Sequence, residues 1–153
     1  MSRRPRAGCR SCRRSFDYPL EQALQGGPPG AYALQAAIAA LHGQAPSAQE
    51  TDWPQIAALY GVLAGIHPSP VVELNRAVAI AMADGLEQGL ALLDTIHLPG
   101  YHLLPAARAD LLRRMDRRAE AAAAYREALG LVTNEAERRF LERRLTEVTR
   151  SRG

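Results

Sequence analysis

Apolar side chains recur every three or four residues along most of this chain, which is the spacing that places them on one face of an α-helix. The pattern predicts about seven helices, over residues 31–44, 53–63, 70–84, 86–96, 101–115, 118–132 and 134–148. No stretch alternates apolar and polar residues as a half-buried strand does. The sequence therefore predicts an all-α protein.

Helix caps and breakers separate these stretches. Ser69 followed by Pro70 is typical of an N-cap and the first helical position, and Asn134 with Glu137 has the pattern of a capping box. Further turn signals, rich in glycine and proline or formed by Asp-Gly, stand at residues 26–30, 84–85 and 99–100. Short connections between helices predict that consecutive helices pair as antiparallel hairpins, including 31–44 with 53–63.

A repeat becomes visible when the chain is compared with itself at a shift of 32 residues. Residues 75–77 then fall on 107–109, Asp84 on Asp116, Gly89 on Ala121, and Leu93 on Tyr125. Ala121, Tyr125 and Ala128 match the small-aromatic-small pattern of the second helix of a tetratricopeptide unit. The first helix departs from that pattern, because Pro105 stands where tryptophan is preferred. The units are therefore described as tetratricopeptide-like.

These patterns predict that residues 17–150 form a single tetratricopeptide-like domain, a right-handed stack of antiparallel helix hairpins. Close helix crossings are expected at Ala77, Ala109, Ala121 and Ala128. The last helix has an apolar side and a charged side, as the cap of a solenoid requires. Its arginines, Arg143 and Arg144 among them, are assigned to a solvated face.

Arginine supplies all 19 basic residues, and its distribution changes the meaning of the formal charge of +3. Six arginines precede the first acidic residue, Asp17, so that 13 arginines face 16 acidic residues in the remainder. A block of like charge without hydrophobic periodicity predicts a disordered arm at residues 1–16. Beyond the arm the chain is mildly acidic, and sequence-specific DNA binding by it is not expected.

The sequence offers little for catalysis or metal binding. Cys9 and Cys12 form one CxxC pair without the second ligand pair that a zinc site needs, and the histidines are scattered. No nucleophile elbow or phosphate-binding glycine loop is present. We therefore expect a non-enzymatic protein without metal, cofactor or small-molecule substrate. Because no apolar run reaches membrane-spanning length and the start lacks a signal-peptide core, a cytoplasmic location is expected.

Several long segments look familiar as an ordered set: YALQAAIAALH (32–42), TDWPQIAALY (51–60), PSPVVELNRAVA (68–79), GYHLLPAARADLLRR (100–114) and NEAERRFLERR (134–144). From about Leu20 to Val148 the chain resembles the C-terminal extension of an extracytoplasmic-function (ECF) RNA polymerase sigma factor. The resemblance implies a tetratricopeptide-like fold and a role in transcription initiation.

In that family, the regions that bind core polymerase and read the promoter precede the extension, and neither is recognisable before Leu20. The resemblance therefore implies a non-catalytic regulatory or protein-interaction domain, with the sigma regions or RNA polymerase as partner. The alternative is a free-standing tetratricopeptide-like adaptor that binds a peptide of another protein. A third hypothesis is nucleic-acid binding through the arginine-rich arm.

Four residues are candidates for a protein-interaction site. Arg76 and Arg108 occupy the same place in the repeat, where paired arginines could clamp an acidic peptide or a carboxyl terminus. Internal ion pairs are the competing interpretation, Arg76 with Glu73 and Arg108 with Asp110 or a neighbouring helix. Trp53 and Tyr101 are candidates either for core anchors or for surface contacts, and the core is favoured.

Overall fold

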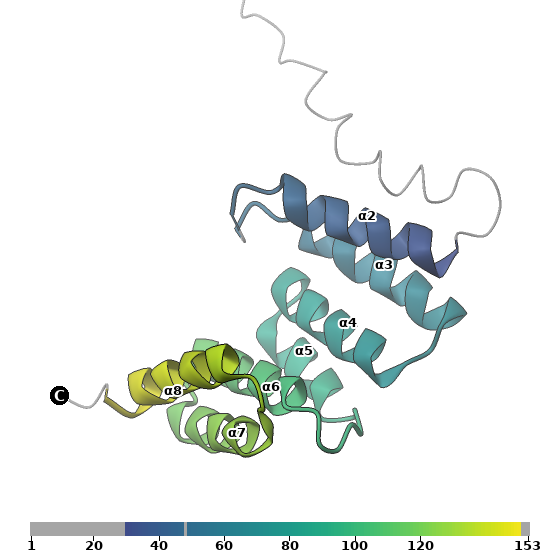
Figure 1. Cartoon of the computed structure of the whole chain (residues 1–153). Helices are drawn as coiled ribbons and strands as arrows, with labels where there is room; N and C mark the ends of the chain where they lie inside the picture. Colours follow the sequence, from purple (N-terminus) through teal and green to yellow (C-terminus); the bar gives the residue numbers. More distant parts are fainter. Residues whose placement is uncertain (1–29, 48, 151–153) are drawn as a thin grey trace, which may run out of the picture. The chain divides into compact units, whose positions relative to one another are not determined.

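The computed structural model describes residues 30–47 and 49–150, and all of its regular structure is helical (Figure 1). Seven helices are present within these residues: α2 (Ala31–Gln44), α3 (Trp53–Ile66), α4 (Pro70–Ala83), α5 (Leu86–Leu93), α6 (Leu103–Arg114), α7 (Arg118–Leu131) and α8 (Glu135–Arg150). No strand occurs in this part of the chain. The predicted all-α class is confirmed. The predicted arm at residues 1–16 lies outside the described residues.

The chain divides into two compact units, one ending at Asp52 and the other beginning at Trp53. In the first unit, α2 buries an apolar stripe at helical spacing, formed by Leu34, Ala37, Ile38 and Leu41. The pairing of α2 with the following helix and the single domain over residues 17–150 stay predictions.

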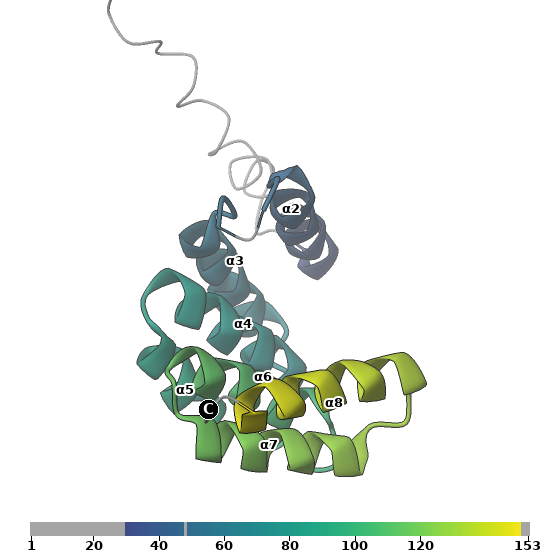
Figure 2. The same cartoon turned by 90° about the vertical axis from the view of Figure 1, so that its left-hand side faces the viewer.

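In the second unit, α3 to α8, consecutive helices pack against one another, most extensively α3 on α4, α4 on α5, α6 on α7, and α7 on α8. Figure 2 shows α7 and α8 side by side at the C-terminal end of this unit. One hydrophobic cluster runs through α4 to α8, from Leu74 to Val148. Tyr125 is the largest of its fully buried side chains.

Small residues bring the helices of this unit into close contact. The exposed fraction of Ala77, Ala109, Ala121 and Ala128 is 0%. A Cβ atom added at Gly89 of α5 would lie 2.7 Å from the carbonyl oxygen of Ala77 on α4 and would collide with the side chain of Ala81. The backbones of α4 and α5 therefore touch at a point where only glycine fits.

Local signals fix the starts of α4 and α8 where the sequence predicts them. The Ser69 hydroxyl accepts a hydrogen bond from the Val71 N–H (3.3 Å) at the start of α4. The Asn134 side chain accepts hydrogen bonds from the N–H groups of Ala136 (2.8 Å) and Glu137 (3.1 Å) at the start of α8.

Two predicted helices are too long. The helix expected over residues 86–96 ends at Leu93, because the N–H of Thr95 and that of Ile96 donate to carbonyl groups three residues back and turn the chain. The helix expected over 101–115 begins at Leu103, after a similar turn at Tyr101. Within the described residues, no helix combines the length and apolarity needed to cross a membrane.

Candidate protein-interaction site

Arg76 is paired inside its own helix. Its Nη1 donates to Oε2 of Glu73 at 3.4 Å, one turn earlier on α4. Its Nε lies 4.0 Å from the place where a Cβ on Gly61 of α3 would stand, so the side chain runs along that neighbouring helix. The intrahelical ion pair weighed from the sequence is the arrangement that the structure has.

Arg108 is paired with a neighbouring helix. Its Nη2 lies 3.0 Å from Oδ1 of Asp94, the C-cap residue of α5. Asp110, the other partner considered from the sequence, instead contacts Arg113 and Arg114. Arg76 and Arg108 thus each have an acidic partner of their own. Their role as a clamp for an acidic ligand stays a prediction.

Tyr101 and Trp53 are both half-buried. Tyr101 packs against the hydrophobic cluster of the second unit, and its ring centroid lies 6.0 Å from that of His102. Trp53 is the first residue of α3. His102 Nε2 lies 2.8 Å from Oε2 of Glu137 on α8, although the two groups are not aligned for a hydrogen bond. This proximity places the beginning of α6 beside that of α8.

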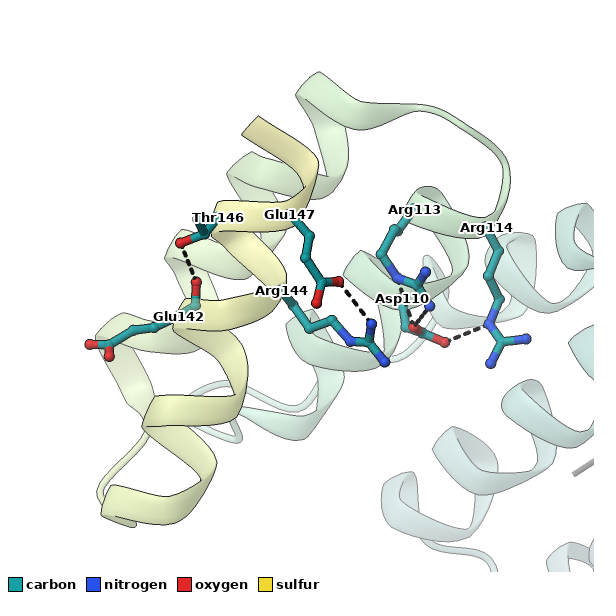
Figure 3. Close-up of polar contacts among 7 residues, drawn as sticks. All are labelled: Asp110, Arg113, Arg114, Glu142, Arg144, Thr146 and Glu147. Carbon is teal, nitrogen blue, oxygen red and sulfur yellow. Dashed lines mark hydrogen bonds and ion pairs between the residues drawn. The ribbon is translucent and has the colours of Figure 1, made fainter. Parts of the chain in front are cut away.

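Figure 3 shows one group of polar contacts on α6 and another on α8. Asp110 is the centre of the group on α6: Oδ1 accepts from Nη2 of Arg113 at 2.6 Å and from its Nε at 3.3 Å, and Oδ2 accepts from Nε of Arg114 at 2.8 Å. These contacts arise because residues three and four apart share one face of a helix. One carboxylate thereby holds two guanidinium groups.

Helix α8 carries the other group. Nη1 of Arg144 donates to Oε2 of Glu147 at 2.8 Å, and its guanidinium lies 5.3 Å from the centre of the Phe140 ring. Nε of Arg144 is buried and has no hydrogen-bond partner among residues 30–47 and 49–150. Figure 3 shows Arg144 pointing from α8 towards Asp110 and Arg113 of α6. We refer to Asp110, Arg113, Arg114, Arg144 and Glu147 as the α6–α8 cluster.

Tyr125 of α7 lies beneath the α6–α8 cluster with an exposed fraction of 1%. Burial raises the pKa of its phenol, and the Asp110 carboxylate adds to that rise, whereas contacts with Arg113 and the charge of Arg144 oppose it. The phenol therefore interacts with Arg113 of α6 and lies within the electrostatic influence of Asp110 on α6 and Arg144 on α8.

Asp110 stays a carboxylate under ordinary conditions. Partial burial by itself would raise the pKa of Asp110, but the hydrogen bonds and positive charges of Arg113 and Arg114 outweigh it and lower the pKa below the ordinary value. The cluster therefore contains three guanidinium groups and two carboxylates. This composition suits the recognition of charged groups on a partner.

This cluster was not predicted from the sequence. Arg144 was expected on a solvated face, whereas its side chain is only 32% exposed and points towards α6. Two features of the sequence could have indicated the cluster: the spacing of Asp110, Arg113 and Arg114 along one helix, and the aromatic position of the repeat at Tyr125. In the described part of the chain, no group of three or more His, Cys, Asp or Glu residues is arranged to hold a metal ion. The CxxC pair, Cys9 and Cys12, lies outside that part.

The chain was compared with known proteins. No family model matches it, and no solved structure matches it either. An uncharacterized protein of Rhizobium meliloti (strain 1021) is 40% identical over 128 residues. The match covers 82% of this chain but only 30% of the relative, so the chain spans less than a third of that longer protein.

Proposed function

We propose that this chain is a C-terminal regulatory and protein-interaction domain of the ECF sigma-factor type, acting in transcription initiation without catalysing a reaction. The observation that carries the proposal is the ordered set of five segments, from residue 32 to residue 144, that resembles this extension. A single short motif could arise by chance, whereas several long segments in one order are far more specific. The sigma regions or RNA polymerase itself would be the partner.

The proposal includes a tetratricopeptide-like arrangement, a right-handed stack of helix hairpins closed by α8. It is supported by positions that recur 32 residues apart: Ala77 and Ala109 are both completely buried, and so is Ala121, the counterpart of Gly89. A stack of this kind presents extended surfaces instead of an enclosed pocket, which suits protein binding. The amphipathic α8 has the form of a terminal cap.

The length of the relative is compatible with this role. The other 70% of the Rhizobium meliloti protein lies outside the segment that matches this chain. A domain that accompanies further regions in a longer protein is what the proposal requires of the family. The remaining length leaves room for regions that bind polymerase and promoter.

The proposal is tested by in vitro transcription with core RNA polymerase. We expect no promoter-specific transcripts from this chain alone, and a change in transcript yield when it is added together with the polymerase-binding and promoter-binding regions of an ECF sigma factor. Specific transcripts from the chain alone would contradict the proposal. No effect in the presence of those regions would favour the free-standing adaptor.

Genomic DNA immediately upstream of codon 1 gives a second test. A sigma region there, in frame or shifted in frame, would support the proposed role. An unrelated upstream sequence would favour the adaptor.

A further inference from the structure

We infer that the α6–α8 cluster, together with Phe140, is the docking surface for an acidic polypeptide segment. This inference rests on the proposed function insofar as the domain binds protein, and it adds the chemistry of the partner. The contacts would be made by Arg114 and Arg144, the two arginines at the edges of the cluster.

Charge is distributed unevenly within the second unit. From Trp53 to Asp94 there are 4 acidic residues and 1 arginine, whereas from Leu103 to Arg150 there are 11 arginines and 8 acidic residues. Helices α6 to α8 therefore carry a positive excess although the chain beyond the arm is acidic overall. A partner segment rich in Asp and Glu would be attracted to this half and repelled by the other.

The internal contacts leave donors for such a partner. Arg114 uses only Nε, towards Asp110, and Arg144 uses only Nη1, towards Glu147. Each guanidinium carries five N–H groups, so further donors remain on both side chains, although the buried Nε of Arg144 is not accessible to a partner. Figure 3 shows the two guanidinium groups on either side of Asp110. Both side chains are partly exposed, Arg114 by 41% and Arg144 by 32%, so they can donate hydrogen bonds to carboxylates of a partner without breaking the existing pairs.

Phe140 adds an apolar contact beside the charges. Its side chain is 46% exposed, and the Arg144 guanidinium lies over the ring, 5.3 Å from its centre. Arginine and aromatic residues are the types enriched at the energetic centres of protein interfaces. The surface thus fits a segment that places an apolar side chain on Phe140 and carboxylates on the flanking arginines.

A protein segment fits this surface better than a nucleic acid. Asp110 and Glu147 lie among the arginines, and they would repel a continuous phosphate backbone. A polypeptide can place its carboxylates opposite the arginines and keep neutral residues opposite Asp110 and Glu147. A surface with mixed charges therefore favours a polypeptide with separated carboxylates over a nucleic acid with continuous negative charge.

The inference is tested with the full chain and fluorescein-labelled synthetic peptides, read by fluorescence anisotropy at low salt. One peptide alternates Asp or Glu with Leu and Phe; its control has Asn and Gln in place of the acids. We expect the acidic peptide to bind at least about tenfold more tightly than its amide control, and Arg144→Gln or Arg114→Gln to weaken it by about three- to tenfold.

Arg143→Gln is the matched control, since Arg143 is the exposed neighbour of Arg144 and carries the same charge. It should change binding less than twofold, as should Arg126→Gln on α7. Equal losses for Arg143→Gln and Arg144→Gln would show diffuse electrostatic attraction and overturn the inference. Equal affinity for the acidic peptide and its amide control would also overturn the inference. The same holds if a labelled DNA duplex binds more tightly than the acidic peptide and Arg144→Gln abolishes that binding.

Melting curves of each variant establish that the fold is kept, and Phe140→Ala provides an independent measurement if an arginine variant is unstable. We expect Phe140→Ala to weaken the acidic peptide and not the duplex. The transcription assay separates the two proposals. If the acidic peptide does not bind but the chain still changes transcription, only the docking surface is contradicted. If the peptide binds but the chain does not change transcription, only the sigma-factor role is contradicted.

Discussion

Ala121 of α7 contributes one methyl group to the hydrophobic cluster of the second unit. Its side chain is completely buried beside Tyr125 and Ala128 in one cluster. Ala121→Leu should therefore overpack the core and lower the free energy of unfolding by roughly 1–3 kcal/mol. Ala123→Leu, on the exposed side of the same helix, is the control and should leave the melting temperature nearly unchanged. An unchanged melting temperature in Ala121→Leu would contradict the repeat interpretation.

The Asp110 carboxylate makes stability depend on pH. Although burial opposes ionisation, Arg113 and Arg114 lower the pKa of Asp110 in the folded state. The folded state thus holds the charged form more firmly than the unfolded chain does. This contribution is complete above the ordinary pKa of aspartate, about 3.9, and is lost as the pH falls through the lower folded-state pKa.

Asp110→Asn should remove this dependence and lower stability near neutral pH by on the order of 1 kcal/mol, since the pairs are partly exposed. Urea unfolding at neutral pH and at about pH 3 measures both effects. Asp84→Asn is the control, because Asp84 is exposed and has no ion pair among the described residues. A wild-type pH profile that Asp110→Asn leaves unchanged would show that other groups cause the acid sensitivity.

Between elements, the crossing of α4 and α5 depends on one glycine. In an unobstructed helix, replacing glycine by alanine stabilises by roughly 0.5–1 kcal/mol. At Gly89 the new methyl group would collide with Ala77 and Ala81, so Gly89→Ala should instead destabilise. Gly130 of α7 has nothing within 4 Å of an added Cβ, and Gly130→Ala should stabilise. Opposite shifts in melting temperature are expected, and a gain for both variants would contradict the close crossing.

Helix boundaries were predictable where a local signal decides them. Ser69 with Pro70 places the start of α4, and Asn134 places that of α8, because their side chains bond to backbone groups within one turn. The ends of α5 and the start of α6 were missed by two or three residues. Ile96 continues the apolar period of Leu92 and Leu93 beyond the helix, since this residue of the following turn also packs on the core.

The candidate site was less predictable than the helices. The Arg76–Glu73 pair follows from helical spacing, so the sequence offered it directly. Arg108 contacts Asp94 at the end of α5, and Arg144 points towards α6. Charge spacing predicts partners within one helix, whereas these two orientations depend on how different helices are placed in the fold.

At the scale of the whole molecule, charge separates into parts with different partners. The first 16 residues contain six arginines and no acid, while the rest has an excess of three negative charges. The α6–α8 surface is a local positive region within that acidic remainder. A polyanion and an acidic peptide should therefore bind through different segments, and substitutions can separate them.

The final prediction is that any DNA affinity of this chain comes from the six arginines of residues 3–14 and is independent of sequence. Contacts of arginine with phosphate release counterions, so the affinity for DNA should fall steeply as the salt concentration rises. Six contacts give a slope of log K against log salt no steeper than about −5. Replacing these six arginines with glutamine should abolish binding, because the remaining chain would repel the duplex. Gel-shift titrations with two unrelated duplexes at several salt concentrations measure slope and selectivity together. A preference for one duplex, or affinity that survives the six substitutions, would show that α2 to α8 recognise DNA and would contradict the assignment of the helical part to protein binding.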